Sequence, residues 1–236
     1  FLTTAYRPGL GSIGIRDIIV GTLAMVGLTL VIAVPIGVLA AIYMGEYAKK
    51  GKVLTTIRFC VESLAGIPSI LYGLFGYTFF AIQLAFGFSL LSSALTLAIM
   101  VLPVIIRSTE EALFTVPDSY REGSLALGAS KLTTLFRVIL PSAIPGILSA
   151  IILSMGRVMG ETAAVYYTAG TMARVPSSVF SSTRSLAVHL YLLVKEGLES
   201  GDAFATATIL IVIVVGLNAL ANFIAKRLSR KLTGGN

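Results

Sequence analysis

Two residues of opposite charge interrupt one of the long apolar stretches of the sequence. Arg157 and Glu161 are four residues apart, so on a continuous helix they share a face and could pair. A guanidinium presents planar paired donors that suit an oxyanion, and a carboxylate accepts a hydrogen bond from an anion that still carries a proton. Charges inside a bilayer cost about 2.5–3.5 kcal/mol each, so they usually mark a pathway. We expect Arg157 and Glu161 to recognise a transported anion, and a purely structural ion pair is the alternative.

Small residues run beside this pair. Gly156, Gly160 and Ala164 recur at four-residue spacing, which allows a neighbouring helix to approach closely. We therefore predict that these three positions serve helix packing. Arg58 and Glu62 have the same spacing near the end of an earlier apolar stretch, and we interpret them as a structural interface pair.

Residues for covalent chemistry are not combined in any familiar pattern. The only Gly-Lys pair, at Gly51 and Lys52, lacks the rest of a nucleotide-binding P-loop. His189 is the sole histidine, and we interpret it as an ordinary loop residue because a metal site needs clustered ligands. One cysteine, Cys60, allows no internal disulfide. We expect this chain to be neither an enzyme nor the holder of a metal or cofactor.

The composition excludes a soluble globular protein. Of the 236 residues, 56% are hydrophobic and 12% are charged, which leaves too little polar surface to cover a water-exposed domain. The formal net charge of +7 is therefore interpreted by its position along a membrane chain, and not as a sign of nucleic-acid binding.

Uncharged stretches predict five membrane spans in a single all-α transmembrane domain covering residues 1–236. A 44-residue uncharged window is divided by a turn around Gly87. One span is expected to hold both Arg157 and Glu161. The predicted spans are 18–44, 60–82, 89–106, 142–165 and 203–225.

The distribution of Lys and Arg predicts the orientation. Twelve of the 18 lie between the first two spans, between the third and fourth, or after the fifth, and positive residues stay in the cytoplasm. This places the C-terminus inside, and residue 1 and the loop 166–202 outside. A chain that starts outside with Phe1 predicts a sixth span upstream.

The cytoplasmic segment 107–141 combines charges with apolar residues at helical spacing. It predicts two short amphipathic helices around Gly123 to Gly128. These helices would lie on lipid or form a docking surface for a partner.

Within this segment, the run Glu122-Gly-Ser-Leu-Ala-Leu-Gly128, nine residues and Val138-Ile-Leu-Pro141 resembles the coupling motif of ABC importer permeases. Gly123 and Ser124 stand where that motif has alanines. The resemblance implies a type I-like helix bundle whose short cytoplasmic helix docks on a separate ATPase. The residues that it assigns to ATPase coupling are Arg121, Glu122, Gly128, Leu140 and Pro141.

Three further stretches resemble the phosphate-importer permeases. They are Glu62 to Phe75, Gly156 to Ala163, and Ser185 to Tyr191, and the last is similar to the PstA-type subunit. The resemblance implies import of inorganic phosphate across a prokaryotic plasma (inner) membrane. It also implies a PstC-type second permease, a pair of ATP-binding subunits that hold ATP and Mg, and an external phosphate-binding protein.

Three other functions are weighed from the residues alone. An ABC permease for another oxyanion, sulfate or molybdate, would use the same guanidinium. A secondary anion transporter with a proton relay through Glu161 is disfavoured by the coupling motif, and an intramembrane enzyme by the absence of a nucleophile with a base.

Overall fold

The computed structural model describes residues 2–4, 6–7, 12–195 and 200–232, and it is helical almost throughout. The exception is a short antiparallel hairpin of β1 (Tyr6–Arg7) and β2 (Ser12–Ile13). The predicted all-α fold is confirmed. The sixth span expected before Phe1 lies outside the described residues and stays a prediction.

Long apolar helices account for all five regions in which spans were predicted. In the described part of the chain, four helical stretches are long and apolar enough to cross a membrane, and a sharply bent helix pair is a fifth candidate. The four are Arg16–Tyr47, Leu90–Phe114, Lys131–Gly160 and Gly201–Arg227, and the bent pair is Lys52–Ala65 with Ser69–Gln83.

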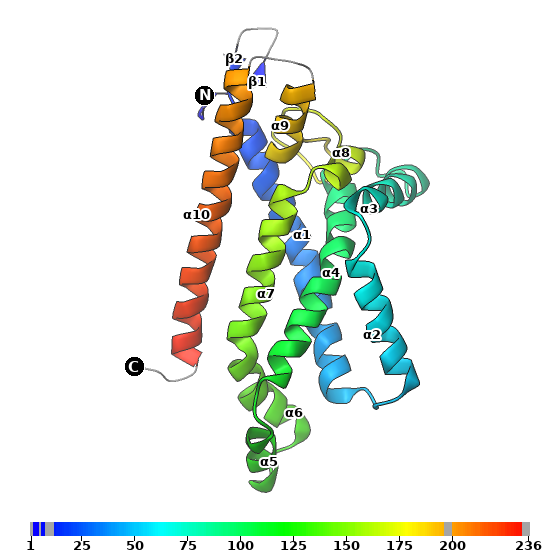
Figure 1. Ribbon diagram of the computed structural model, residues 1–236, viewed down its shortest axis with the longest axis vertical. Helices are drawn as coiled ribbons and strands as arrows, with labels where there is room; N and C mark the ends of the chain where they lie inside the picture. Colours follow the sequence, from blue (N-terminus) through cyan, green and yellow to red (C-terminus); the bar gives the residue numbers. More distant parts are fainter. Residues whose placement is uncertain (1, 5, 8–11, 196–199, 233–236) are drawn as a thin grey trace.

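Helix α4 (Leu90–Phe114) occupies the middle of the bundle (Figure 1). The side chain of Ser89 caps its start by accepting a hydrogen bond from the Ser92 amide at 3.1 Å. Its main neighbour is α1 (Arg16–Ile42), and the side chains of Met25, Met100 and Ile105 are buried in the core between these helices and the others. At Gly37 of α1, a β-carbon would lie 2.6 Å from a methyl group of Ile105, so this crossing requires glycine.

The second apolar region is a broken helix and not the straight span predicted for 60–82. Helix α2 (Lys52–Ala65) and α3 (Ser69–Gly76) meet at 98°, and α3 continues as a π-helical segment, η3 (Tyr77–Gln83). Pro68 has no amide hydrogen and disfavours helix at the residue before it, which explains the break. As a result α2 packs on α4, whereas α3 packs mainly on α8 (Ala163–Ala169).

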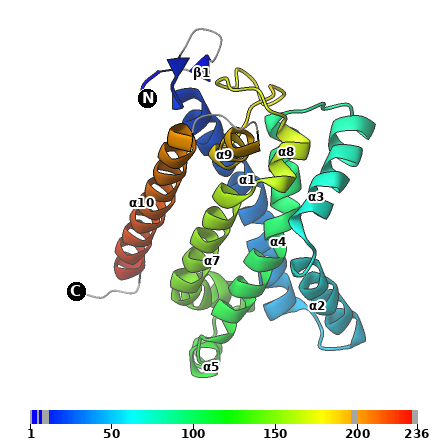
Figure 2. The ribbon, with the colours of Figure 1, turned by 45° about the horizontal axis from the view of Figure 1, so that its top comes forward.

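The fourth predicted span, 142–165, also differs from the structure. Helix α7 (Leu140–Gly160) ends at Gly160, and Glu161 is extended, with φ −75° and ψ 126°. Helix α8 then starts in a new direction (Figure 2). Towards the N-terminus, α7 continues from the π-helical segment η4 (Leu135–Ile139) and α6 (Lys131–Thr134), so the helical stretch starts eleven residues before the predicted span.

Different elements lie at the two ends of the bundle (Figure 1). At one end, α5 (Asp118–Ala126) and α6 project beyond α4 and α7. At the other end lie the hairpin, α8, α9 (Leu186–Lys195) and the loop between α8 and α9. Helix α10 (Ser200–Leu232) stands on the opposite side of the bundle from α2 and contacts α7 and α9.

Candidate functional site

Arg157 lies in the last turn of α7 and is partly buried. The helix that carries it, α7, packs mainly on α4 and α10. The ion pairs between described residues do not include Arg157. A half-buried guanidinium without a carboxylate partner retains its donors for another anion.

Glu161 is separated from Arg157 by the end of α7. Its Oε1 accepts a hydrogen bond from the backbone amide of Ala164 at 3.3 Å, in the first turn of α8. The expectation that Arg157 and Glu161 share a helical face is therefore wrong, because the helix does not continue between them. Both side chains are still partly buried at the same break between α7 and α8, and their role towards substrate stays a prediction.

An open cavity of about 600 Å³ is lined partly by α8, the helix that follows this break, and we call it the outer cavity after the orientation that the sequence predicts. Ring stacking of Tyr77 on Phe88, with centroids 5.4 Å apart, forms one wall. Tyr166 and Tyr167 of α8 meet edge to face at 5.6 Å and form another. The full lining is Tyr77, Phe88, Tyr166, Tyr167, Gly170, Thr171, Met172 and Ser182.

The outer cavity could not be recognised from the sequence, because its lining residues come from separate segments. Tyr166 and Tyr167 fit an interfacial aromatic belt, and only the turn of the chain after Gly170, whose φ is +83°, brings Met172 and Ser182 opposite them. Helix α8, which follows Glu161, contributes Tyr166 and Tyr167 to the outer cavity, and η3 contributes Tyr77.

The small residues predicted to form one packing stripe face different neighbours. A β-carbon at Gly156 would touch Asn218 of α10 at 3.5 Å, and one at Gly160 would meet nothing within 4 Å. Ala164 is fully buried, and a β-carbon at Gly73 of α3 would lie 2.9 Å from its Cα. The break after Gly160 turns Ala164 away from the other two, so the three do not line a single helix.

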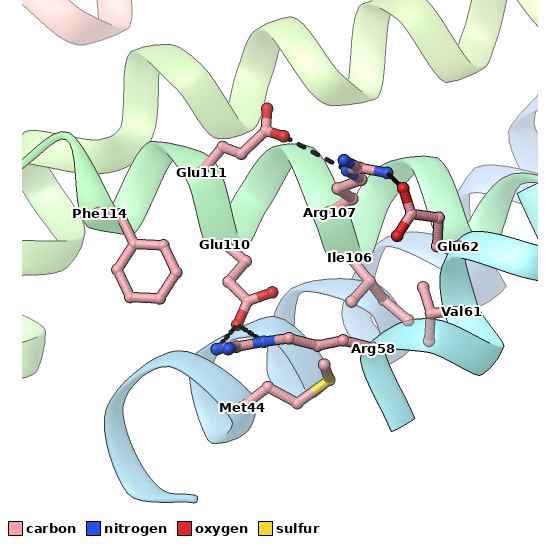
Figure 3. A pocket seen from close by; sticks show the side chains of 9 residues that line it. All are labelled: Met44, Arg58, Val61, Glu62, Ile106, Arg107, Glu110, Glu111 and Phe114. Atoms are coloured by element: carbon pink, nitrogen blue, oxygen red, sulfur yellow. Dashed lines mark hydrogen bonds and ion pairs between the residues drawn. The ribbon is translucent and has the colours of Figure 1, made fainter. Parts of the chain in front are cut away.

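A cluster of five charged side chains joins α2 to the far end of α4 (Figure 3). Arg58 donates to Glu110 through Nε at 3.0 Å and Nη2 at 2.5 Å. Arg107 donates to Glu62 at 2.7 Å and lies 3.5 Å from Glu111. We call this set the inner charged cluster.

The inner charged cluster overturns the expected Arg58–Glu62 pair. Both residues face α4, where each finds an oppositely charged partner, because α2 packs on α4 through the side that carries them. A tertiary contact of this kind is invisible to helical spacing. With two arginines and three carboxylates around a cavity of about 260 Å³, the cluster fastens α2 to α4 and does not present spare positive charge.

Glu110→Gln is expected to lower the free energy of unfolding by about 1–2 kcal/mol, because a bond from Arg58 to a charged and buried acceptor is lost. The expected loss is modest because Arg58 is partly exposed, so that water screens part of its attraction to Glu110. Glu111→Gln is the matched control, since its carboxylate is exposed and the expected change is within about 0.5 kcal/mol. Thermal unfolding of both variants in detergent checks the difference, and equal melting temperatures would contradict it.

The segment 107–141, which is predicted to be cytoplasmic, contains the two predicted short helices, α5 and α6. Ser124 of α5 and Thr134 of α6 hydrogen-bond at 2.9 Å, which holds the helices together. The turn between them places Gly128 at φ +83°, a conformation that favours glycine. Exposed apolar residues occur on both helices, in the turn between them and at the start of η4, namely Tyr120, Leu125, Leu127, Leu132 and Phe136.

Among the residues assigned to ATPase coupling, Arg121 has internal partners. It donates to Glu46 at 2.8 Å and to the carbonyl groups of Leu113 and Val116 at 2.9 and 2.8 Å, so it anchors α5 to α4 and to the end of α1. Glu122 and Gly128 are exposed, whereas Leu140 and Pro141 are partly buried at the start of α7.

His189 is not the loop residue that the sequence suggested. It lies in α9 with 1% of its surface exposed, and burial, with the nearby charge of Arg184, lowers the pKa of its imidazole from 6.5 to about 3. The apolar neighbours in Leu186–Lys195 were the available signal of a helix.

The lowered pKa of His189 predicts a loss of stability in acid. The unfolded chain takes up a proton below about pH 6.5, and the folded chain does so only near pH 3, so stability falls as the pH drops through this window. Between pH 7.5 and 5.0 the loss attributable to His189 is about 2 kcal/mol. Melting temperatures of the wild type and His189→Gln at both pH values test this. An equal drop in both proteins would contradict it.

Comparisons with known proteins agree on the type of protein. Residues 33–234 match the family model "Binding-protein-dependent transport system inner membrane component". The chain is 35% identical to the probable ABC transporter permease protein YqgI of Bacillus subtilis, over 99% of this chain and 85% of the relative. It is 37% identical to the phosphate transport system permease protein PstA 1 of Mycobacterium tuberculosis, over 92% and 72%.

Solved structures share the fold. A chain of the MetNI methionine ABC transporter, in an inward-facing conformation, superposes with a TM-score of 0.68 at 23% identity, covering 92% of this chain and 94% of that one. A chain of a bacterial alginate ABC transporter, in complex with an alginate-bound periplasmic protein, gives a TM-score of 0.70 at 16% identity, over 90% and 78%.

Proposed function

Since the chain belongs to the family of inner-membrane components of binding-protein-dependent transport systems, we propose that it is a PstA-type permease for inorganic phosphate. The family makes the chain a multi-pass inner-membrane subunit of an ABC importer. Such a permease is non-catalytic, because ATP is hydrolysed on a separate subunit, and it works with an external binding protein.

Phosphate as the substrate is supported by relatives and by chemistry. Several relatives named PstA are 31–37% identical over about nine tenths of the chain. The observation that carries the proposal is Arg157, a half-buried guanidinium with no carboxylate partner among the described residues, beside Glu161 at the break between α7 and α8. We infer that both side chains contact the same anion at this break.

Glu161 would provide discrimination. Phosphate at neutral pH still carries a proton and can donate a hydrogen bond to an ionised carboxylate, whereas sulfate only accepts. The carboxylate would therefore repel sulfate and accept phosphate, which is selectivity through a penalty on the competitor.

The remaining assembly follows from the same proposal. A second permease of PstC type completes the pathway, and one of a pair of ATP-binding subunits docks on α5 and α6, which carry exposed apolar side chains. In this assembly, α5, α6 and the C-terminus lie in the cytoplasm, and residue 1 and the loop after α8 lie outside.

Uptake by the reconstituted transporter tests the substrate. The complex of both permeases and the ATPase, in vesicles with the external binding protein, is expected to import labelled phosphate only with ATP. Import of sulfate or molybdate in place of phosphate would favour another oxyanion permease. Uptake that survives removal of the ATPase would point to secondary transport.

The outer loop is expected to meet the binding protein. A photo-crosslinker at the exposed Phe180, in the loop between α8 and α9, should capture that protein during transport. A crosslinker at Val31, an exposed residue midway along α1, is the control and should capture lipid or permease instead. Capture of the binding protein at neither position, or equally at both, would argue that the loop is merely solvated.

A further inference from the structure

A second cavity of about 600 Å³ lies where α1 ends and α2 begins, and we call it the inner groove. Helix α1 passes there into a π-helical segment, η2 (Tyr43–Tyr47), and a short turn leads to α2. The size is in the range of ligand-binding pockets, about 300–1,000 Å³. The lining residues are Ala40, Tyr43, Met44, Tyr47, Ala48, Lys49, Val53, Leu54 and Ile57.

Lys49 lines the inner groove, and two more lysines follow it in the turn that leads to α2. Lys49, Lys50 and Lys52 are exposed in the turn, and the ion pairs between described residues include none of the three. The two carboxylates next to the groove are already neutralised, since Glu46 is bonded to Arg121 at 2.8 Å and Glu110 to Arg58. The positive charge at the mouth of the groove is therefore uncompensated within the described chain.

The inner groove also has exposed apolar residues. Tyr43, in η2, and Val53, in α2, both line the groove. The accessible fraction is 62% for Tyr43 and 76% for Val53. Exposed Ile36 and Leu39 continue the apolar strip along α1, at the spacing of one helix face. Since the apolar membrane-crossing stretch of α1 ends at Tyr47, this strip leads from the groove into the bilayer.

This combination fits one class of ligand. A free inorganic anion would use the lysines but not the apolar walls, and a purely apolar helix would leave the lysines without counter-charge. A phospholipid has both parts, and basic residues just outside a membrane helix attract anionic headgroups. Tyrosine at this depth is typical of the boundary between headgroups and acyl chains.

We propose that the inner groove binds an anionic phospholipid of the cytoplasmic leaflet. The headgroup phosphate contacts Lys49 and Lys52, and one acyl chain lies over Tyr43, Val53 and Ile57 towards Leu39. This site is separate from Arg157 and from the substrate path.

The bound lipid would contact η2, the segment that holds α6. Lys131 of α6 donates to the carbonyl of Glu46, and its ammonium group lies 4.8 Å from the centre of the Tyr47 ring. Tyr47 is thus shared between the groove and α6. Occupancy of the groove should order the η2 segment and, through it, the seat of α5 and α6.

Native mass spectrometry of the complete transporter, purified in mild detergent and supplied with phosphatidylglycerol or phosphatidylcholine, tests the proposal. The wild type should retain phosphatidylglycerol in preference to phosphatidylcholine. Lys49→Gln with Lys52→Gln should reduce phosphatidylglycerol retention by roughly tenfold, because each lysine near the headgroup adds to the attraction. Lys226→Gln with Arg227→Gln, which removes two exposed charges from α10 on the other side of the bundle, is the matched control and should change it little.

Location is tested by a photoreactive phosphatidylglycerol with its label on the acyl chain. Crosslinked peptides should include Tyr43 to Ile57. Equal losses in the two double variants would show only a general attraction to positive charge and would overturn the proposal. Crosslinking of this region to the second permease in place of lipid would overturn it as well, by assigning the groove to a protein interface.

Discussion

Arg157→Gln is expected to abolish phosphate uptake while leaving the transporter assembled. The substitution keeps much of the length and polarity of the side chain but removes the charge and the paired donors. A hydrogen bond to a charged group contributes about 1.5–3 kcal/mol, and two of them would account for a loss of at least roughly 100-fold. Arg157→Lys, which keeps the charge without the planar fork, should retain part of the activity.

The matched control for this experiment is Arg174→Gln. Arg174 is exposed in the outer loop, so its loss removes the same charge from a place without burial. ATP-driven uptake and co-purification of all subunits are measured together. Normal uptake by Arg157→Gln would show that the substrate path lies elsewhere and would also remove the main support for phosphate.

Glu161→Gln separates discrimination from binding. Glutamine still accepts a hydrogen bond at Ala164, so the start of α8 should be preserved. Without the negative charge, sulfate is no longer repelled, and competition of sulfate with phosphate uptake should increase several-fold. Unchanged discrimination would limit Glu161 to capping α8.

Gly128→Ala is expected to uncouple transport from ATP hydrolysis. A β-carbon at Gly128 would meet nothing within 4 Å, so the effect comes from the backbone alone: at φ +83° a non-glycine residue costs about 1–2 kcal/mol. Relief of this strain would rotate α6 against α5 and displace the exposed apolar side chains that we assign to the ATPase contact.

Gly123→Ala is an unusually close control for this change. Gly123 also has open space around its position, but it lies inside α5, where alanine favours the helix by up to about 1 kcal/mol. Gly128→Ala should lose ATPase co-purification and uptake, and Gly123→Ala should keep both. Equal behaviour of the two variants would contradict a role for the turn geometry.

The positions of the long apolar helices were predictable because hydrophobic length is a direct consequence of the thickness of the bilayer. Bends were less predictable. Pro35, Pro103 and Pro145 lie within helices that continue through them, whereas Pro68 lies at a 98° break. The difference comes from the residues before Pro68, where Gly66 ends α2, and from the separate surfaces that α2 and α3 pack on.

The site was predictable in its residues and not in its geometry. An arginine and a glutamate in an apolar stretch are conspicuous from their cost alone. The predicted placement of the two side chains on one face assumed an unbroken helix. In the structure the helix ends at Gly160, and Glu161 is extended between Gly160 and Thr162. The inner charged cluster and the outer cavity join segments distant in the sequence, so no local spacing could reveal them.

Helix α4 also sets how motion can pass through the molecule. Its 25 residues form a rod of about 37 Å. At the outer end, the amides of Ser89, Leu90 and Leu91 donate to carbonyl groups of Thr168, Ser181 and Val179. At the inner end, Glu110 holds Arg58 of α2. A displacement of the loop between α8 and α9, such as the proposed binding protein would cause, is therefore transmitted along one stiff helix to α2, and the 98° bend before α3 separates α2 from the rest of the broken helix.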